Sequence, residues 1–147
     1  MHIPAKVDYG IRALVDLALH ADEQPIRASQ IARRTIIPEP YLAQVMHTLG
    51  KSGIIHSQRG PNGGHSLALT PRAIKLSMIL DCLGNSENLV TCLEDVNSCF
   101  HVPTCAQREV WQSVEKAIYE ILDSKTIADL VVRSQDILKK QTLVKTT

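Results

Sequence analysis

Aromatic residues are scarce in this chain of 147 residues, in which they make up 3% of the sequence. The apolar core must therefore be built from Ile, Leu, Val and Ala. No apolar run approaches the roughly 18 residues that a membrane-spanning helix requires. The N-terminal segment lacks the apolar stretch of a signal peptide. These absences predict a cytoplasmic protein, and the length predicts one domain or one small domain with a helical arm.

The sequence also lacks low-complexity segments, repeats with a period of roughly 20–50 residues, and a strong overall charge, since its net charge is +1. Its two halves differ, however. Residues 1–80 contain nine Lys or Arg and five Asp or Glu, whereas residues 81–147 contain seven and ten. A mildly basic first half is typical of a protein that presents one face to a polyanion. Ordinary scatter of surface charge explains the same numbers equally well.

Apolar residues recur at helical spacing in the first half and predict helices over residues 7–21, 28–34 and 39–51. The second helix is expected to turn Arg33 and Arg34 outward. The third helix begins at a proline-containing turn, where the missing N–H of proline is tolerated. Its predicted buried side consists of Leu42, Val45, Met46 and Leu49.

Two short apolar strands, 54–58 and 65–69, flank a glycine-rich turn and predict a β-hairpin. Three helices followed by a hairpin are the order of a winged helix-turn-helix, in which the third helix is the recognition helix. The predicted fold class is therefore mostly α with a small β-hairpin wing.

The second half of the chain is predicted to contain a short helix over 77–83, an irregular stretch, a long amphipathic helix over 105–123 and a final helix capped by Thr126. The predicted domains are a winged helix-turn-helix of residues 1–83, a cysteine-bearing loop of 84–104 and a helical region of 105–147.

The recognition helix carries polar side chains opposite its apolar side. Gln44, His47, Thr48 and Lys51 recur at i, i+3, i+4 and i+7. A glutamine can bond adenine through two hydrogen bonds, and a lysine near the helix end suits a phosphate. Arg59 at the hairpin turn is suited to the negative potential of a minor groove. A solvated surface helix and a plain hairpin would show the same residues, but their combination favours a DNA-reading surface.

Three of the four cysteines, Cys92, Cys99 and Cys105, fall in one short polar stretch. Clustered cysteines in a cytosolic protein indicate metal or redox chemistry rather than structural disulfides. Spacing alone leaves an iron–sulfur cluster, a zinc ion and thiol oxidation open. Cys82 lies on a predicted helix beside Ile79 and is expected to be a buried, inert thiol. No Gly-rich catalytic loop or Cys/His signature indicates an enzyme.

The chain resembles the bacterial winged-helix regulator family that contains the iron–sulfur proteins IscR, NsrR and RirA and the cysteine regulator CymR. The resemblance covers nearly the whole chain and is most specific in the wing. It is carried by Asp8-Tyr9-Gly10-Ile11-Arg12-Ala13-Leu14, Tyr41-Leu42-Ala43-Gln44 with Leu49, Ser57-Gln58-Arg59-Gly60-Pro61-Asn62-Gly63-Gly64 with Leu67, Trp111, and Thr126-Ile127-Ala128-Asp129-Leu130. His65 stands where an aromatic residue is often found in the family.

The resemblance implies a homodimer in which the two long helices cross, which makes residues 105–123 a dimerisation helix. Two winged helices would then bind a double-stranded operator whose half-sites lie one or two turns apart, in multiples of roughly 34 Å. By the same resemblance, Tyr41 and Gln44 face the major groove, Arg59 enters the minor groove, and Ser29 contacts a phosphate.

The resemblance also implies that Cys92, Cys99 and Cys105 bind a 2Fe–2S or 4Fe–4S cluster, in a loop most similar to that of NsrR. Arg108 stands where IscR-like proteins have a histidine ligand. Asp8 of the partner subunit matches the carboxylate ligand of NsrR-like proteins, and His101 is the alternative.

The function that follows is a DNA-binding transcriptional repressor whose cluster senses nitric oxide, iron status or redox state. The alternative is a winged-helix regulator of the same family that works by thiol oxidation or holds zinc.

Overall fold

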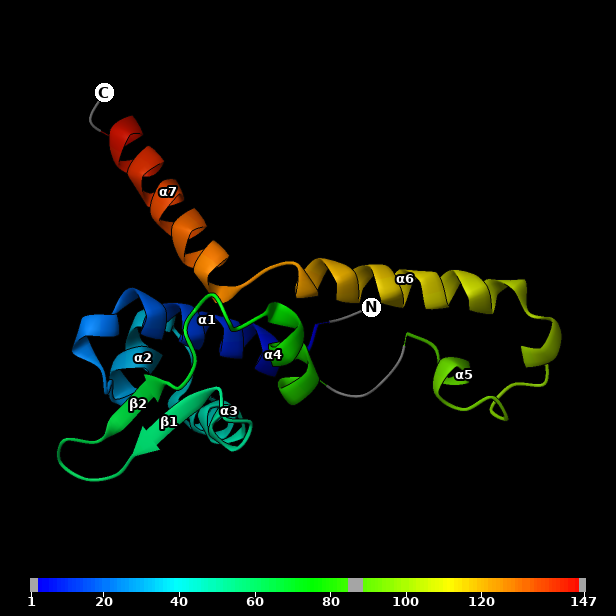
Figure 1. Ribbon diagram of the computed structural model, residues 1–147, viewed down its shortest axis with the longest axis horizontal. Helices are drawn as coiled ribbons and strands as arrows, with labels where there is room; N and C mark the ends of the chain where they lie inside the picture. Colours follow the sequence, from blue (N-terminus) through cyan, green and yellow to red (C-terminus); the bar gives the residue numbers. More distant parts are fainter. Residues whose placement is uncertain (1–2, 85–88, 146–147) are drawn as a thin grey trace.

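The computed structural model describes residues 3–84 and 89–145, which are mostly helical and include a two-stranded antiparallel hairpin (Figure 1). The predicted fold class is confirmed. Residues 1–2, 85–88 and 146–147 of the predicted domains lie outside the described residues. The main elements are α1 (Ala5–Leu19), α2 (Ala28–Thr35), α3 (Glu39–Lys51), β1 (Ile55–Gln58), β2 (Gly64–Leu67), α4 (Leu76–Leu83), α5 (Thr91–Glu94), α6 (Ala106–Asp123) and α7 (Ile127–Lys145).

Several boundaries differ from the predicted ones: the first helix covers Ala5–Leu19 rather than 7–21, and the second strand covers Gly64–Leu67 rather than 65–69. The stretch expected to be irregular contains α5 and a 3₁₀ turn, Val102–Thr104. The final helix, which the sequence predicts to run through Leu138, continues to Lys145. Its start is capped as predicted, because the Thr126 hydroxyl accepts a hydrogen bond from the Asp129 amide at 3.2 Å while the Asp129 carboxylate accepts from the Thr126 amide at 2.8 Å. This reciprocal arrangement is a capping box.

The core lies among α1, α2, α3 and α4, with the start of α7 joined to it. Burial of one side of each helix follows from the helical spacing of its apolar residues. Leu42, Val45, Met46 and Leu49 of α3 are buried as predicted. The opposite side of α3 therefore remains available to solvent and to a ligand.

An ion pair joins α1 to α2 at the edge of the core. Asp16 is buried, with 6% of its surface exposed. The Arg34 guanidinium donates two hydrogen bonds of 2.8 Å to its two carboxylate oxygens. These hydrogen bonds raise the pKa of Arg34 above its usual value, so the arginine stays charged. Arg34 is exposed as the sequence predicts, yet its guanidinium is committed to the structure of the helix pair.

The turn between α2 and α3 passes through Ile36, which has φ 57° and ψ 43°. This left-handed conformation is rare for a β-branched residue and is usually taken by glycine after a helix. The Ile36 side chain is 85% exposed. The turn therefore leads into the recognition helix through a strained residue.

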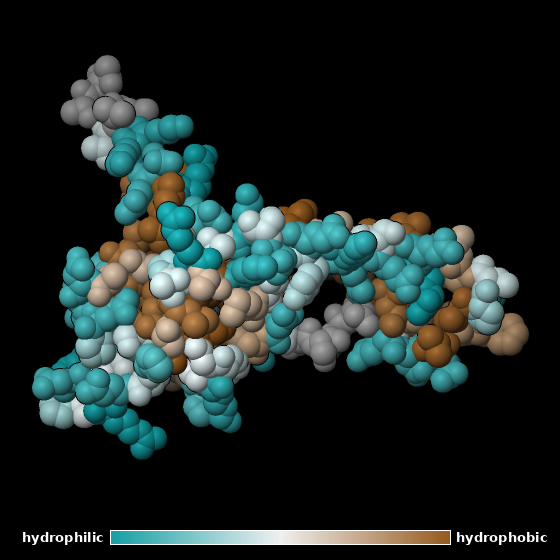
Figure 2. Space-filling view, viewed as in Figure 1, coloured by the Kyte–Doolittle hydropathy of each residue, from teal (hydrophilic) through white to brown (hydrophobic). Residues whose placement is uncertain are grey.

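The helix α6 extends away from the α1–α4 domain, and α5 lies near its far end (Figure 1). None of the residues of α6 is buried. Its C-terminal end is attached to α4, because Asp123 accepts hydrogen bonds of 2.8 Å from Lys75 and Ser77 and Asp81 accepts one of 3.0 Å from Tyr119. Apolar surface is visible along α6 and at the base of α7 (Figure 2). In the part of the chain that is described, no helix is long and apolar enough to cross a membrane.

Candidate DNA-binding surface and cysteine loop

The exposed side of α3 carries most of the side chains that the sequence assigns to base reading. Gln44, His47 and Lys51 are exposed, and Tyr41 is 59% exposed. Thr48 is half-buried, and its hydroxyl donates to the Gln44 carbonyl oxygen at 3.1 Å. The Thr48 oxygen therefore keeps an acceptor role, while its proton is used within the helix.

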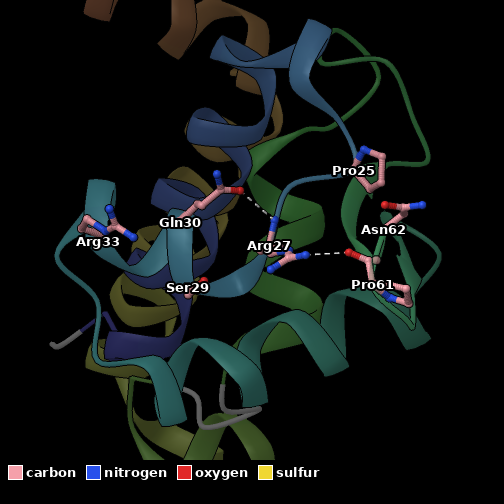
Figure 3. A pocket seen from close by; sticks show the side chains of 8 residues that line it. Pro25, Arg27, Ser29, Gln30, Arg33, Pro61 and Asn62 are labelled. Carbon is pink, nitrogen blue, oxygen red and sulfur yellow. Dashed lines mark hydrogen bonds between the residues drawn. The ribbon is translucent and has the colours of Figure 1, made fainter.

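The wing lies beside the recognition helix. The strands β1 and β2 pair in an antiparallel register that sets Ile55 opposite Leu67 and Gln58 opposite Gly64. Arg59 follows β1 directly and is exposed. It lines one hollow together with His47 of α3, so the structure brings these two predicted residues together. Ser29 lines a neighbouring hollow between α2 and the wing tip (Figure 3).

Two arginines beside that second hollow were not singled out as binding residues by the sequence. Arg27 and Arg33 line it together with Ser29 and Asn62. Three groups that can bind a phosphate thus lie at the start of α2 and on its exposed side. The signal in the sequence was the basic excess of the first half, which does not tell which arginines share a surface.

His65 lies at the base of the wing. Burial lowers the pKa of His65, which keeps its ring neutral at neutral pH. Its Nδ1 lies 2.9 Å from the Ser57 hydroxyl on the paired strand. The residue that departs from the family pattern is therefore a structural part of the hairpin.

The three clustered cysteines lie on residues 89–105, between α4 and α6, which we call the cysteine segment. Cys92 is in α5, Cys99 precedes the 3₁₀ turn, and Cys105 flanks the start of α6. Each is half-buried, and all four cysteines of the chain are free thiols. Two side chains of α6 hold this segment. The Arg108 Nε donates to the Cys92 carbonyl at 3.2 Å, and Glu115 accepts from the Leu89 amide at 2.6 Å.

The donor set fits a soft metal or an iron–sulfur cluster, because it consists of three thiols on one segment. Within residues 3–84 and 89–145, no three His, Cys, Asp or Glu side chains come together in a way that would hold a metal ion.

The two candidates for a further ligand, Asp8 and His101, have different surroundings. Asp8 is in the first turn of α1, where its carboxylate forms a 2.6 Å ion pair with Arg12. Both side chains are about half exposed, so this pair is accessible to exchange. His101 is exposed and contacts the Phe100 ring edge-on, with 6.0 Å between the ring centroids.

Cys82 is separate from these three thiols. It lies on α4 and its sulfur donates to the Ile79 carbonyl at 3.6 Å. Burial raises the pKa of the Cys82 thiol, so it remains protonated at neutral pH. An inert thiol is expected from these surroundings, as the helical spacing indicates.

A helix-turn-helix with a wing, whose recognition helix exposes hydrogen-bonding and basic side chains, defines a DNA-binding transcriptional regulator. The Rrf2 family model, described as "Iron-dependent Transcriptional regulator", matches residues 3–133. The chain therefore belongs to the Rrf2 family, and the resemblance seen in the sequence is confirmed.

Individual relatives agree with this assignment. The protein rrf2 of Nitratidesulfovibrio vulgaris is 34% identical over 131 residues, which cover 89% of this chain and 87% of that protein. The solved structure of T. potens IscR is similar with a TM-score of 0.76 and 34% identity, covering 93% and 90% of the two chains. CymR of B. subtilis, named a global cysteine regulator, has a TM-score of 0.74 and 32% identity, covering 90% and 98%. The family is one of transcriptional regulators, not of enzymes.

Proposed function

We propose that this protein is a homodimeric repressor whose affinity for operator DNA is controlled by an iron–sulfur cluster on the cysteine segment. The observation that carries the proposal is the set of three free, half-buried thiols on the segment that leads into α6. The start of α6 lies away from α3 and the hairpin (Figure 1). Family membership supports DNA binding, and the description of the family as iron-dependent supports an iron cofactor. The proposed cytoplasmic location agrees with thiols that stay reduced.

In this proposal the recognition helix α3 enters the major groove with Tyr41 and Gln44, and Arg59 of the wing enters the adjacent minor groove. The exposure of these side chains supports the assignment. His47, Thr48 and Lys51 complete the face of α3, and Ser29 contacts a phosphate from the start of α2.

Replacing Gln44 by alanine should weaken operator binding roughly 5–150-fold, which corresponds to the 1–3 kcal/mol that a two-bond contact to a base contributes. Arg59→Ala should weaken binding and lower the slope of log affinity against log salt by about one. Fluorescence anisotropy on a duplex selected by the wild-type protein from random sequence measures both. The matched controls Arg133→Ala and Gln135→Ala lie on exposed positions of α7 and should leave affinity unchanged. Unchanged affinity in Gln44→Ala and Arg59→Ala would reject this surface.

Cys92, Cys99 and Cys105 would hold the cluster, and the partner subunit's Asp8 is the proposed further ligand, with His101 as the alternative. When bound, the cluster would supply iron that reacts with nitric oxide or oxidants. A carboxylate is a hard ligand and is displaced more easily than a thiolate. Asp8 must leave Arg12 to serve in this way, which its half-exposed ion pair permits. The ligand set would then tie the cysteine segment of one subunit to α1 of the other.

Apolar exposure on α6 supports the homodimer. Val110, Val114, Ala117 and Ile121 recur at i, i+4, i+7 and i+11 and form one stripe along the helix. Val110 and Ile121 are exposed at 58% and 63%. A second copy of α6 offers the same apolar stripe, as a two-fold symmetric interface requires.

Protein purified without oxygen should contain iron and sulfide and bind the selected duplex roughly 5–150-fold more tightly than the metal-free protein, the usual range for coupled sites. Cys99→Ser should lose the iron and bind DNA as the metal-free protein does. Cys82→Ser is the control. The half-buried Cys82 thiol lies on α4, apart from the other three, so this variant should leave the iron content unchanged. Absorption spectroscopy, iron, sulfide and zinc analysis and anisotropy measure these outcomes.

Equal affinities of the iron-loaded and metal-free proteins would refute control by the cluster. Zinc without sulfide would identify a zinc-containing regulator. A colourless protein whose affinity changes on thiol oxidation would identify a thiol sensor. The variants of Gln44 and Arg59 test the DNA-binding role separately from the cluster.

A further inference from the structure

The base of the wing is fastened to the segment that precedes α2. Ile26 and His65 exchange two backbone hydrogen bonds, of 2.9 and 2.7 Å. The Gln24 side-chain oxygen accepts from the Leu67 amide at 2.9 Å, and its nitrogen donates to the Leu17 carbonyl at 2.8 Å. The hairpin thus has a third backbone neighbour and a link to α1, which fixes where its base lies.

This close approach depends on Gly64. Its φ is +155°, and a Cβ placed on it would lie 2.6 Å from the carbonyl carbon and oxygen of Ile26. Because these are backbone atoms, they cannot move aside as a flexible side chain can. Glycine at this position therefore allows the second strand to pair with Ile26.

The tip of the wing, residues 59–63, extends beyond this base. Among the described residues, the side-chain hydrogen bond that links the tip to the rest of the domain comes from Arg27, whose Nη2 donates to the Pro61 carbonyl at 2.6 Å (Figure 3). Arg27 is itself held at the start of α2, where its backbone amide donates to the Gln30 side-chain oxygen at 3.3 Å. The guanidinium thus connects a fixed helix start to the tip.

We infer that Arg27 is a positioning residue for DNA recognition, which fixes the wing tip against α2 and thereby directs Arg59. The inference rests on the proposed function, because it assumes that Arg59 contacts DNA. Gly60 has φ +108°, a conformation that favours glycine. Without the hydrogen bond from Arg27, the tip would therefore have wide conformational freedom. Fixing the tip before binding removes part of the ordering cost from complex formation.

Arg27→Gln separates this role from a direct phosphate contact. The variant should bind the selected duplex about 5–10-fold more weakly, and the slope of log affinity against log salt should be unchanged because no phosphate contact is lost. The backbone amides of Gly60, Asn62, Gly63 and Gly64 should exchange hydrogen faster in the free protein. Arg33→Gln is the matched control, since Arg33 lines the same hollow (Figure 3). Arg33→Gln should leave amide hydrogen exchange in the wing unchanged, whether or not it alters the slope of log affinity against log salt.

The double variant Arg27→Gln/Arg59→Ala tests whether Arg27 acts through Arg59. It should bind DNA no more weakly than Arg59→Ala alone, because the two effects share one route. Gly64→Ala provides a second test without changing charge. It too should weaken DNA binding and speed amide hydrogen exchange at Gly60, Asn62 and Gly63, with an unchanged slope of log affinity against log salt.

Unchanged affinity in Arg27→Gln would overturn the inference. The inference would also be overturned if Arg27→Gln lowered the slope of log affinity against log salt by about one while amide hydrogen exchange in the wing stayed normal. That result would identify Arg27 as a phosphate contact. If either of these results came with the expected loss of affinity in Gln44→Ala and Arg59→Ala, the proposed DNA-binding surface would still hold. Failure of Gln44→Ala and Arg59→Ala to weaken binding would instead reject that surface itself.

Discussion

Arg34→Met should lower the free energy of unfolding by about 2–4 kcal/mol, because it removes both guanidinium hydrogen bonds to the buried Asp16 carboxylate and leaves only His20, whose Nδ1 lies 3.5 Å away. Removing one member of a buried pair usually costs about 3–5 kcal/mol. The lower range is expected here because 29% of the Arg34 side chain is exposed, so part of the interaction is screened. Denaturant unfolding followed by circular dichroism measures the change.

Two further variants separate this ion pair from the general effect of losing an arginine. Arg33→Met removes a neighbouring charge on the same helix, from a residue that is exposed. It should change stability by less than about 0.5 kcal/mol. Asp16→Leu/Arg34→Met removes both charges and should recover part of the loss, since no buried carboxylate remains unpaired. A stability of Arg34→Met equal to that of Arg33→Met would show that the pair contributes nothing.

The Asp16–Arg34 pair also shows which parts of the fold could be predicted from the sequence. Helical periodicity predicts that Leu42, Val45, Met46 and Leu49 are buried, because burial of a helix side depends on spacing along one segment. An ion pair between α1 and α2 depends on which residues meet after the helices pack. The sequence predicts that Arg34 is exposed, but it does not predict that Arg34 pairs with Asp16.

The same distinction applies to the backbone. The glycine-rich turn predicts the hairpin, since glycine is suited to tight turns. The left-handed Ile36 has no such signal, because a β-branched residue rarely takes that conformation. Ile36 ends α2, and its backbone amide donates to the Ala32 carbonyl.

The cysteine segment was predicted as a loop with three thiols, and spacing along the sequence was enough for that. Its attachment to α6 through Arg108 and Glu115 was not predicted, because both contacts involve backbone atoms of the segment. The sequence has Arg108 where the resemblance implies a histidine ligand in IscR-like proteins. Its guanidinium has a structural role here, since it binds the Cys92 carbonyl. The identity of the cofactor and of the further ligand stays a prediction.

Control of DNA binding from the cysteine segment requires a mechanical connection between the two regions. The helix α6 carries the segment at its start and is attached to α4 at its end through Asp123 and Tyr119. The helix α4 in turn packs on α1 and α3. A change in the angle between two α6 helices would therefore move the two recognition helices relative to each other. Dimerisation through α6 is the condition on which this control depends.

Ile121→Glu should convert the proposed dimer into a monomer and weaken operator binding by about 10²-fold or more, because two linked domains bind two half-sites with a large gain from effective concentration. A carboxylate in an apolar interface loses its hydration without gaining a partner. Ile121 is 63% exposed in the single chain, so the fold itself should remain intact. Gln112→Glu adds the same charge half a turn away around α6 and should leave a dimer. Sedimentation velocity and circular dichroism measure both variants, and a dimeric, tightly binding Ile121→Glu protein would rule out this interface.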